Sequence, residues 1–256
     1  MNNVFKKYAD YYNLLYYDKD YRSEVNYIDS LIKTYEKNRS SSILDLGCGT
    51  GIHANMLAEI GYKVHGKDIS SEMIDIAKKT FNRKELKFEI GDIRSFETED
   101  KYDVVLSLFH VMSYQTSNED LINALKCVKK SMKPSGVFIF DSWYGPAVLN
   151  IKPGPTTKNL EDDRLKVNRV ATPELDQMNN TVKVNYKINI TDKSNLKTFS
   201  FEESHLMRYL FFQELQILLN RIDMEIIETL EWMSYNNPNL NSWASTFVVK
   251  NKLIAQ

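Results

Sequence analysis

The segment ILDLGCGTG holds the most distinctive chemical pattern in this sequence. An apolar stretch ends at Asp45 and leads into Gly47, Gly49 and Gly51. Glycines this dense indicate positive φ angles or a ligand that approaches the backbone closely. The spacing puts Ile52 where a dinucleotide-binding turn has its third glycine, and a carboxylate at the strand end repels phosphate. We therefore expect a ligand with a cationic group rather than a pyrophosphate.

Two further carboxylates follow later apolar segments. Asp68 stands about 20 residues beyond the glycine turn, where doubly wound folds bind ribose hydroxyls with an acid. Asp92 follows the next segment, where its side chain can meet an adenine amino group while Ile93 packs against the ring. Each acid alone could be a helix cap, but structural turns give no reason for acids at three successive strand ends. An ammonium, a ribose and an adenine without phosphate describe S-adenosylmethionine, so we expect this cofactor.

Alternating apolar segments and helical patterns must position these acids. Five buried strands joined by helices predict a parallel sheet with right-handed crossovers, a doubly wound, Rossmann-like α/β fold. The last two strands are expected to pair antiparallel at its edge, which gives a mostly parallel seven-stranded sheet. Asn118 is the expected cap of the helix before the fifth strand, and Pro134 with Gly136 the expected turn into that strand. The expected strands are 43–46, 62–68, 86–92, 101–110, 136–141, 224–233 and 245–251, and the expected helices include 1–38, 70–81, 118–132 and 211–222.

The pattern changes after Asp141. Residues 165–171, 181–191 and 196–209 alternate between apolar and polar side chains, which predicts an antiparallel β insert after the fifth strand. The insert interrupts a single large domain. We expect four parts: an N-terminal helical lid at 1–38, a cofactor-binding core at 39–144, the insert at 145–209, and completion of the core sheet at 210–256.

The chain resembles the class I S-adenosylmethionine-dependent methyltransferases over residues 40–141 and 212–250. ILDLGCGTG, the acid of HGKD, GDI and VVLSLFH carry the resemblance. It implies that the glycine turn holds the methionine part, Asp68 the ribose and Asp92 the adenine, while Cys48 contributes its backbone. The expected cofactor-binding residues are Tyr8, Tyr21, Asp45, Gly47, Cys48, Gly49, Gly51, Asp68, Ile69, Met73, Asp92, Ile93, Leu108 and Phe109.

The candidate catalytic residues are His110, His205 and Tyr16. His110 comes directly after the fourth strand, on the cleft side of the sheet, and His205 lies in the insert. An amine acceptor must be neutral to attack, whereas a sugar hydroxyl usually needs a base nearby. The residues leave nitrogen and oxygen acceptors open. We expect His53 and His65 to be structural.

A nucleic-acid substrate is disfavoured. The formal net charge is −1, without the clustered Lys and Arg that neutralise phosphates. DNA amino-methyltransferases carry Asp/Asn-Pro-Pro-Tyr/Phe after the fourth strand, where this chain has SLFH. No apolar run is long enough to span a membrane and the N-terminus is too polar for a signal peptide, so we expect a cytoplasmic protein. Its two cysteines lack metal-ligand spacing, and no metal is expected.

A narrower resemblance lies outside the core. ADYYNLLYYDKDYRSE and FEESHLMRYLFFQEL are similar to N,N-dimethyltransferases that act on nucleotide-linked amino sugars. That resemblance implies a tyrosine-rich N-terminal helix that closes over the cofactor, and an insert that shapes the sugar site and helps build a homodimer. DSWYGPAVL is similar to bacterial methyltransferases presumed to modify surface sugars, which suggests polysaccharide biosynthesis. The expected substrate-binding residues are Tyr12, Trp143, Tyr144 and Arg208, the last for a phosphate.

The favoured hypothesis is N-methylation of a nucleotide-linked amino sugar. The first alternative is O-methylation of a sugar hydroxyl or small carboxylate, with His110 or His205 as the base. The second is a non-catalytic S-adenosylmethionine sensor or partner subunit. An oxidoreductase is disfavoured by the glycine spacing.

Overall fold

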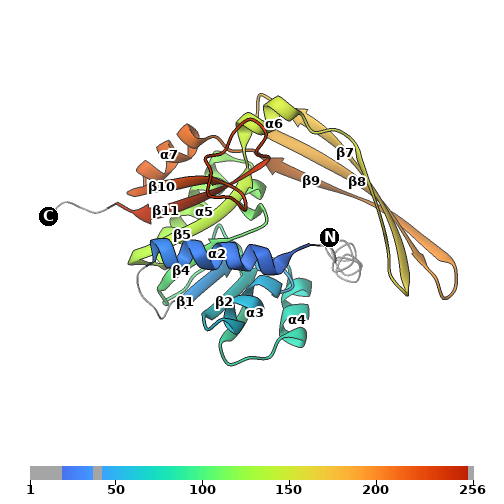
Figure 1. The fold of residues 1–256 in the computed structure, drawn as a ribbon, viewed down its shortest axis with the longest axis horizontal. Coiled ribbons are helices and arrows are strands. Elements are labelled where there is room, and N and C mark those ends of the chain that lie inside the picture. Colours follow the sequence, from blue (N-terminus) through green and yellow to red (C-terminus); the bar gives the residue numbers. More distant parts are fainter. Residues whose placement is uncertain (1–18, 37–41, 253–256) are drawn as a thin grey trace.

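The computed structural model describes residues 19–36 and 42–252, and its main layer is the seven-stranded sheet that the sequence predicts (Figure 1). The strand order is β10-β11-β5-β4-β1-β2-β3. Strands β1 to β5 pair in parallel, and β11 is antiparallel to both β5 and β10, which confirms the predicted edge. The strands are β1 Ser42–Leu46, β2 Lys63–Asp68, β3 Leu86–Ile90, β4 Tyr102–Ser107, β5 Met132–Trp143, β10 Met224–Glu231 and β11 Ala244–Asn251.

Helices cover both faces of this sheet. On one face, α2 (Tyr21–Tyr35), α3 (Ile52–Glu59) and α4 (Ser71–Thr80) share a hydrophobic cluster with the strands. On the other, α5 (Asn118–Ser131) and α7 (Phe212–Asn220) share a second cluster. Two buried cores on opposite faces are what a parallel sheet requires, because its strands are apolar on both sides.

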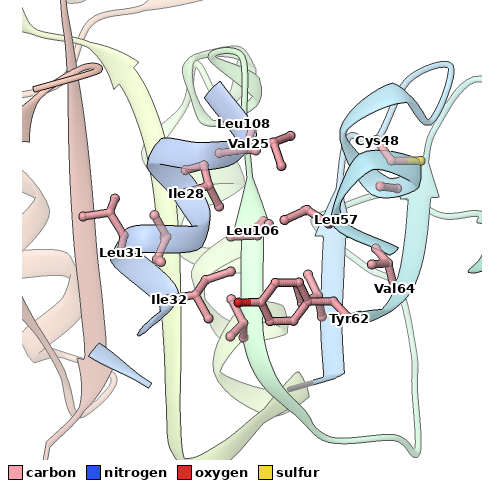
Figure 2. Close-up of a cluster of buried hydrophobic side chains, with 14 of the residues drawn as sticks. Val25, Ile28, Leu31, Ile32, Cys48, Leu57, Tyr62, Val64, Leu106 and Leu108 are labelled. Atoms are coloured by element: carbon pink, nitrogen blue, oxygen red, sulfur yellow. The ribbon is translucent and has the colours of Figure 1, made fainter. Parts of the chain in front are cut away.

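The helix α2 crosses the sheet with one apolar face turned inward. Asp20 caps it by accepting a 2.9 Å hydrogen bond from the backbone N–H of Ser23. Figure 2 shows Val25 and Ile28 of this helix beside Leu106 and Leu108, at and just beyond the end of β4. This packing holds the beginning of α2 near the carboxyl ends of the strands. The rest of the predicted helix 1–38 lies largely outside the described residues.

Two local predictions differ from the structure, and two short elements were not predicted. Ser117, not Asn118, caps α5, because its hydroxyl accepts a hydrogen bond from the backbone N–H of Asp120. Strand β5 already begins at Met132, and the predicted turn is instead an irregularity in its pairing with β4. A short 3-10 helix, η1 (Val111–Tyr114), and the helix α6 (Gly145–Ile151) were not predicted.

A second, four-stranded antiparallel sheet extends away from the main sheet (Figure 1). Its strands are β6 (Thr156–Glu161), β7 (Leu165–Asp176), β8 (Thr181–Asp192) and β9 (Lys197–Arg208), in that order. The three predicted strands are present: β7 and β8 extend further than predicted, β9 is one residue shorter at each end, and β6 was missed. The base of the sheet packs on the core through a cluster that includes Val148 and Tyr209, with Trp143 and Trp243 beside it. The second sheet thereby reaches the carboxyl ends of the main strands. The predicted four-part division of the chain stays a prediction.

Candidate active site

One cavity of about 710 Å³ lies where the carboxyl ends of the parallel strands meet the base of the second sheet. The parallel strands supply its acids and glycines, and β7, β8 and β9 supply the opposite wall. The predicted residues that line it are Tyr21, Asp45, Gly47, Cys48, Gly49, Asp68, Ile69, Met73, Asp92, Ile93, Leu108, Phe109, His110, Trp143 and His205. The fold thus brings most of the predicted site to one place.

The remaining six predicted site residues fall into two groups. Tyr8, Tyr12 and Tyr16 lie outside the described residues. Gly51, Tyr144 and Arg208 are described but do not line the cavity. Gly51 begins α3 and faces Phe88, and Tyr144 precedes the first turn of α6.

The glycine turn is built around positive φ angles. Gly47, Gly49 and Gly51 have φ of +78°, +54° and +81°, conformations that residues with a Cβ rarely adopt. A Cβ on Gly47 would lie 2.4 Å from Val111, whereas a Cβ on Gly49 would meet nothing within 4 Å. Gly47 is thus required by packing, and Gly49 presents bare backbone to the cavity.

Asp45 is a buried acid with unused bonding capacity. Its side chain is almost fully buried, and Oδ2 has no hydrogen-bond partner among the described residues. Burial, with a smaller contribution from Asp68, raises the pKa of Asp45 to about 6, while His53 opposes the rise. An ammonium group placed here would pair with the carboxylate and favour its charged form. The Asp45 carboxylate therefore fits the ammonium group in the methionine part of S-adenosylmethionine.

Asp68 connects the end of β2 to the glycine turn. Its Oδ2 accepts a 2.9 Å hydrogen bond from the Gly49 backbone N–H, and its Oδ1 accepts one of 2.8 Å from Ser70. Burial nevertheless raises the pKa of this carboxyl. Each carboxylate oxygen can accept a second hydrogen bond, so two ribose hydroxyls remain chemically compatible with the group.

Asp92 is paired with an arginine that the sequence reasoning did not include. Arg94 reaches both carboxylate oxygens of Asp92, at 2.6 to 3.1 Å, and also pairs with Asp120. The guanidinium lowers the pKa of Asp92, which keeps this carboxylate charged. An adenine amino group would have to share Asp92 with Arg94.

The beginning of α2 is fastened to the cavity wall by charge and aromatic contacts. His53, expected to be structural, lines the cavity, and its Nε2 lies 2.7 Å from a Glu24 carboxylate oxygen. The ammonium of Lys19 lies 4.5 Å from the ring centre of Tyr21 and 4.4 Å from that of Phe109. Lys19 also pairs with Glu24. Such cation–aromatic contacts tie the helix to the strand ends.

The two candidate catalytic histidines differ in how their nitrogens are used. His205 has partners at both, because Nδ1 lies 2.8 Å from the Tyr114 hydroxyl and Nε2 lies 3.4 Å from a Glu203 oxygen. His110 has Nδ1 2.6 Å from Oδ2 of Asp141, while its Nε2 has no partner among the described residues. His110 is therefore the better proton acceptor of the two, whereas His205 holds Tyr114. By contrast, His65 is buried between Tyr102 and Glu89, away from the cavity.

Arg208 does not supply the expected phosphate contact. Its buried guanidinium donates to Asn118 and the Thr116 carbonyl and pairs with Glu214, so its charge is already neutralised outside the cavity. Arg169 of β7 lines the cavity instead, 4.8 Å over the ring of Tyr186. No carboxylate of the described chain pairs with Arg169.

A signal for Arg169 was present in the sequence. In a strand, residues two apart share a face, so Arg169 shares its face with Val167 and Ala171. Both neighbours are buried. An arginine between two inward-facing apolar residues indicates a charge turned towards the interior, which needs an anionic partner.

The described residues lack two other features that would point to a function. No three His, Cys, Asp or Glu side chains in residues 19–36 and 42–252 come together as a metal site. None of the helices in the same ranges is both long and apolar enough to cross a membrane.

Comparison with known proteins agrees with this geometry. Residues 43–136 match the protein family described as Methyltransferase domain. A dTDP-3-amino-3,4,6-trideoxy-alpha-D-glucopyranose N,N-dimethyltransferase of Streptomyces venezuelae is 30% identical over 54% of this chain, and the match spans only 58% of that relative. A dTDP-3-amino-3,6-dideoxy-alpha-D-glucopyranose N,N-dimethyltransferase of Streptomyces fradiae is 26% identical over 77% of this chain and 75% of its own length.

A solved structure extends the similarity to nearly the whole chain. The crystal structure of an S-adenosylmethionine-dependent methyltransferase from Clostridium acetobutylicum superposes with a TM-score of 0.81 at 22% identity, covering 98% of this chain and 100% of the other. At this identity the likeness concerns the fold. Residues 43–136 therefore match a methyltransferase domain, and the chain has the fold of the Clostridium S-adenosylmethionine-dependent methyltransferase.

Proposed function

We propose that the protein transfers a methyl group from S-adenosylmethionine to the amino group of a nucleotide-linked amino sugar. The observation that carries this proposal is the composition of this cavity. One wall holds Asp45, Asp68 and Asp92, and the other holds Arg169 above an aromatic ring. Acids suit an ammonium and a ribose, and a guanidinium that pairs with no carboxylate of the described residues suits a diphosphate. The names of the Streptomyces relatives supply the same substrate class.

The acid-lined half would hold the cofactor. Asp45 would pair with the ammonium group, Asp68 with the ribose, and Asp92 with the adenine, beside Ile93. S-adenosylmethionine, when bound, supplies a methyl group on a positively charged sulfur. The residues of this half orient the donor and keep water away, which are the main contributions to such a transfer.

The half formed by the second sheet would hold the acceptor. Arg169 would bind the diphosphate as a planar, doubly hydrogen-bonded pair, and Trp143 and Tyr186 offer ring faces to the sugar or base. His110 Nε2 would accept the proton that the acceptor nitrogen must lose to be neutral. Tyr114, held by His205, stands on the same wall.

O-methylation of a sugar hydroxyl is the second candidate. It is favoured by the carboxylate beside His110, since a hydroxyl needs a stronger base than an amine does. The two candidates share the cofactor half and differ only in the acceptor.

A matched pair of substrates separates the two functions. The protein is incubated with S-adenosylmethionine and either a nucleotide-linked amino sugar or the corresponding hydroxyl sugar, and the products are weighed by mass spectrometry. We expect a gain of about 14 or 28 Da on the amino sugar alone, one or two methyl groups. A gain on the hydroxyl sugar alone would favour O-methylation. Cofactor binding without turnover on either panel would favour a non-catalytic partner.

The second sheet is also the proposed dimer surface. Apolar side chains remain exposed along it, among them Leu196 at 80% and Phe199 at 49% of full exposure. Pairing with a second copy would cover such side chains. Light scattering on a size-exclusion column should give twice the monomer mass, and a monomer would exclude this arrangement. A cytoplasmic location and a place in polysaccharide biosynthesis stay predictions from the sequence.

A further inference from the structure

A buried carboxylate stands behind His110. Asp141 lies at the end of β5, and its parallel neighbour β4 leads into His110. Oδ2 of Asp141 accepts a 3.1 Å hydrogen bond from the His110 backbone N–H and lies 2.6 Å from the ring Nδ1. The carboxylate is fully buried, whereas the imidazole is partly exposed to the cavity.

The ring contact is close but incompletely aligned. Nδ1 of His110 and Oδ1 of Asp141 are both buried, and neither makes a well-directed hydrogen bond within the described chain. A proton on Nδ1 therefore has this carboxylate as its available acceptor. Buried polar groups strongly favour such pairing, because an unmade bond is costly away from water.

The backbone and the aromatic neighbours restrict the imidazole. Phe109 and His110 both have φ of +64°, which is costly for residues with a Cβ. The bond from the His110 backbone N–H to Asp141 supports this unusual turn. The ring stacks on Phe109 at 5.7 Å between centroids and meets the edge of Trp143 at 6.2 Å. The histidine is thus held between two rings with one nitrogen towards the carboxylate.

We propose that Asp141 is a positioning residue that keeps the proton of neutral His110 on Nδ1. The lone pair of Nε2 then faces the cavity and can accept the proton of the methyl acceptor. The charge that forms on the imidazole is stabilised by the adjacent carboxylate. The inference rests on the proposed function for its substrate, but the tautomer is a property of the protein itself.

Other titratable groups face this pair from α2. Tyr27 lies on the same side of the sheet, and its hydroxyl donates to Thr246, the residue paired with Asp141 in β11. Burial, with a minor contribution from Asp141, raises the pKa of Tyr27 to about 12, so this phenol stays neutral. The Lys19 ammonium lies 4.4 Å from the ring centre of Phe109, the aromatic ring on which the imidazole stacks.

The first test reads the tautomer directly and needs no substrate. Nitrogen-15 NMR of the full chain with S-adenosylmethionine bound should show neutral His110 protonated on Nδ1. In Asp141→Asn the amide can donate to Nδ1, so the proton should move to Nε2. A wild-type His110 protonated on Nε2 would overturn the proposal, whether or not a substrate has been found.

The second test uses turnover on whichever acceptor is methylated. Asp141→Asn should lower kcat/KM by about 10²- to 10⁴-fold, in the range of general-base losses, and shift the acidic limb of the pH–rate profile. Cofactor affinity measured by calorimetry should stay within twofold. The double variant with His110→Gln should be no slower than the slower single variant, because the two residues act as a unit.

A matched control excludes a general effect of losing a buried acid. Asp103, at the start of β4, is buried and pairs with Lys133 away from the cavity. Asp103→Asn should lower the melting temperature but leave the His110 tautomer and the pH profile as they are. Equal pH profiles in Asp141→Asn and wild type, or additive losses in the double variant, would refute the positioning role. Absence of methylation on every acceptor with the expected tautomer would instead count against the proposed function.

Discussion

The backbone N–H of Gly49 donates a 2.9 Å hydrogen bond to Oδ2 of Asp68. The end of one parallel strand thereby fixes the shape of the turn that follows its neighbour. The acid expected to bind the ribose is also a support for the bare backbone of Gly49. Binding and local structure therefore depend on the same carboxylate.

Removal of Asp68 should weaken cofactor binding. For Asp68→Ala we expect a loss of about 1–3 kcal/mol in S-adenosylmethionine affinity, from missing charged hydrogen bonds and a loosened turn. Calorimetry measures the change. Asp75→Ala, which removes an exposed acid from α4, is the control and should bind normally. Unchanged affinity in Asp68→Ala would remove this residue from the site.

Asp45 should make both stability and cofactor binding depend on pH. Its pKa is about 6 in the folded protein, against 3.8 for an ordinary Asp. Because the folded pKa is raised, the stabilising contribution is present below about pH 4 and is lost as the pH rises through about 6. The shift corresponds to about 3 kcal/mol. Asp45→Asn should therefore become more stable than wild type, by up to that amount, between pH 4 and 7.

Cofactor titration gives the opposite trend for the same residue. An ammonium prefers the charged carboxylate, so wild-type affinity should rise as the pH increases through 6. Asp45→Asn should bind weakly at every pH. Denaturant unfolding and calorimetry across this range measure the two effects. A wild-type affinity that does not change between pH 5 and 7 would contradict the role of Asp45.

Replacement of Arg169 should affect substrate binding, whereas replacement of Arg208 should affect stability. Arg169→Ala should raise KM for a diphosphate-bearing acceptor by about 10-fold or more, since a charged hydrogen bond contributes about 1.5–3 kcal/mol. Its melting temperature should change little. Arg208→Ala should instead lower stability by about 3–5 kcal/mol, because Glu214 loses its buried partner. Steady-state kinetics and thermal unfolding on both variants test this, and the reverse pattern would return the phosphate role to Arg208.

The glycine turn allows a third contrast. Gly47→Ala should destabilise the protein by about 2–4 kcal/mol, because the new Cβ meets Val111 and the residue has a positive φ. Gly49→Ala has open space around its Cβ, so its stability should fall only by the backbone strain of a positive φ. Its methyl group would project into the cavity and reduce cofactor affinity. Equal stability losses in the two variants would show that packing against Val111 is unimportant.

The sequence predicted the sheet and its acids because both follow from local patterns. Buried parallel strands read as continuous apolar runs, and the crossover rule places the ends of their strands together. The positions of Asp45, Asp68 and Asp92 at neighbouring strand ends could be predicted from these patterns alone. The pairing of Asp92 with Arg94 could not be predicted in the same way, because it depends on side-chain directions that spacing alone does not define.

The second sheet was harder to predict for a physical reason. Its strands are only partly buried, so their alternation is weak, and β6 carries a pattern with few apolar residues. Pro173 in the interior of β7 also argued against a long strand. Arg208 was given the phosphate role because it stands in an alternating segment, and its packing against α5 and α7, where Asn118 and Glu214 bind its guanidinium, could not be predicted from that pattern.

The place of β11 between β5 and β10 has a consequence for how the chain folds. Residues 244–251 are made after every other strand, yet they complete the middle of one half of the sheet. Until they leave the ribosome, β5 has an open edge with Phe138 and Phe140 beside it, a template for wrong pairing between nascent chains. Folding of this half must therefore wait until residues 244–251 have been made, and loss of β11 should cause aggregation rather than a smaller folded protein.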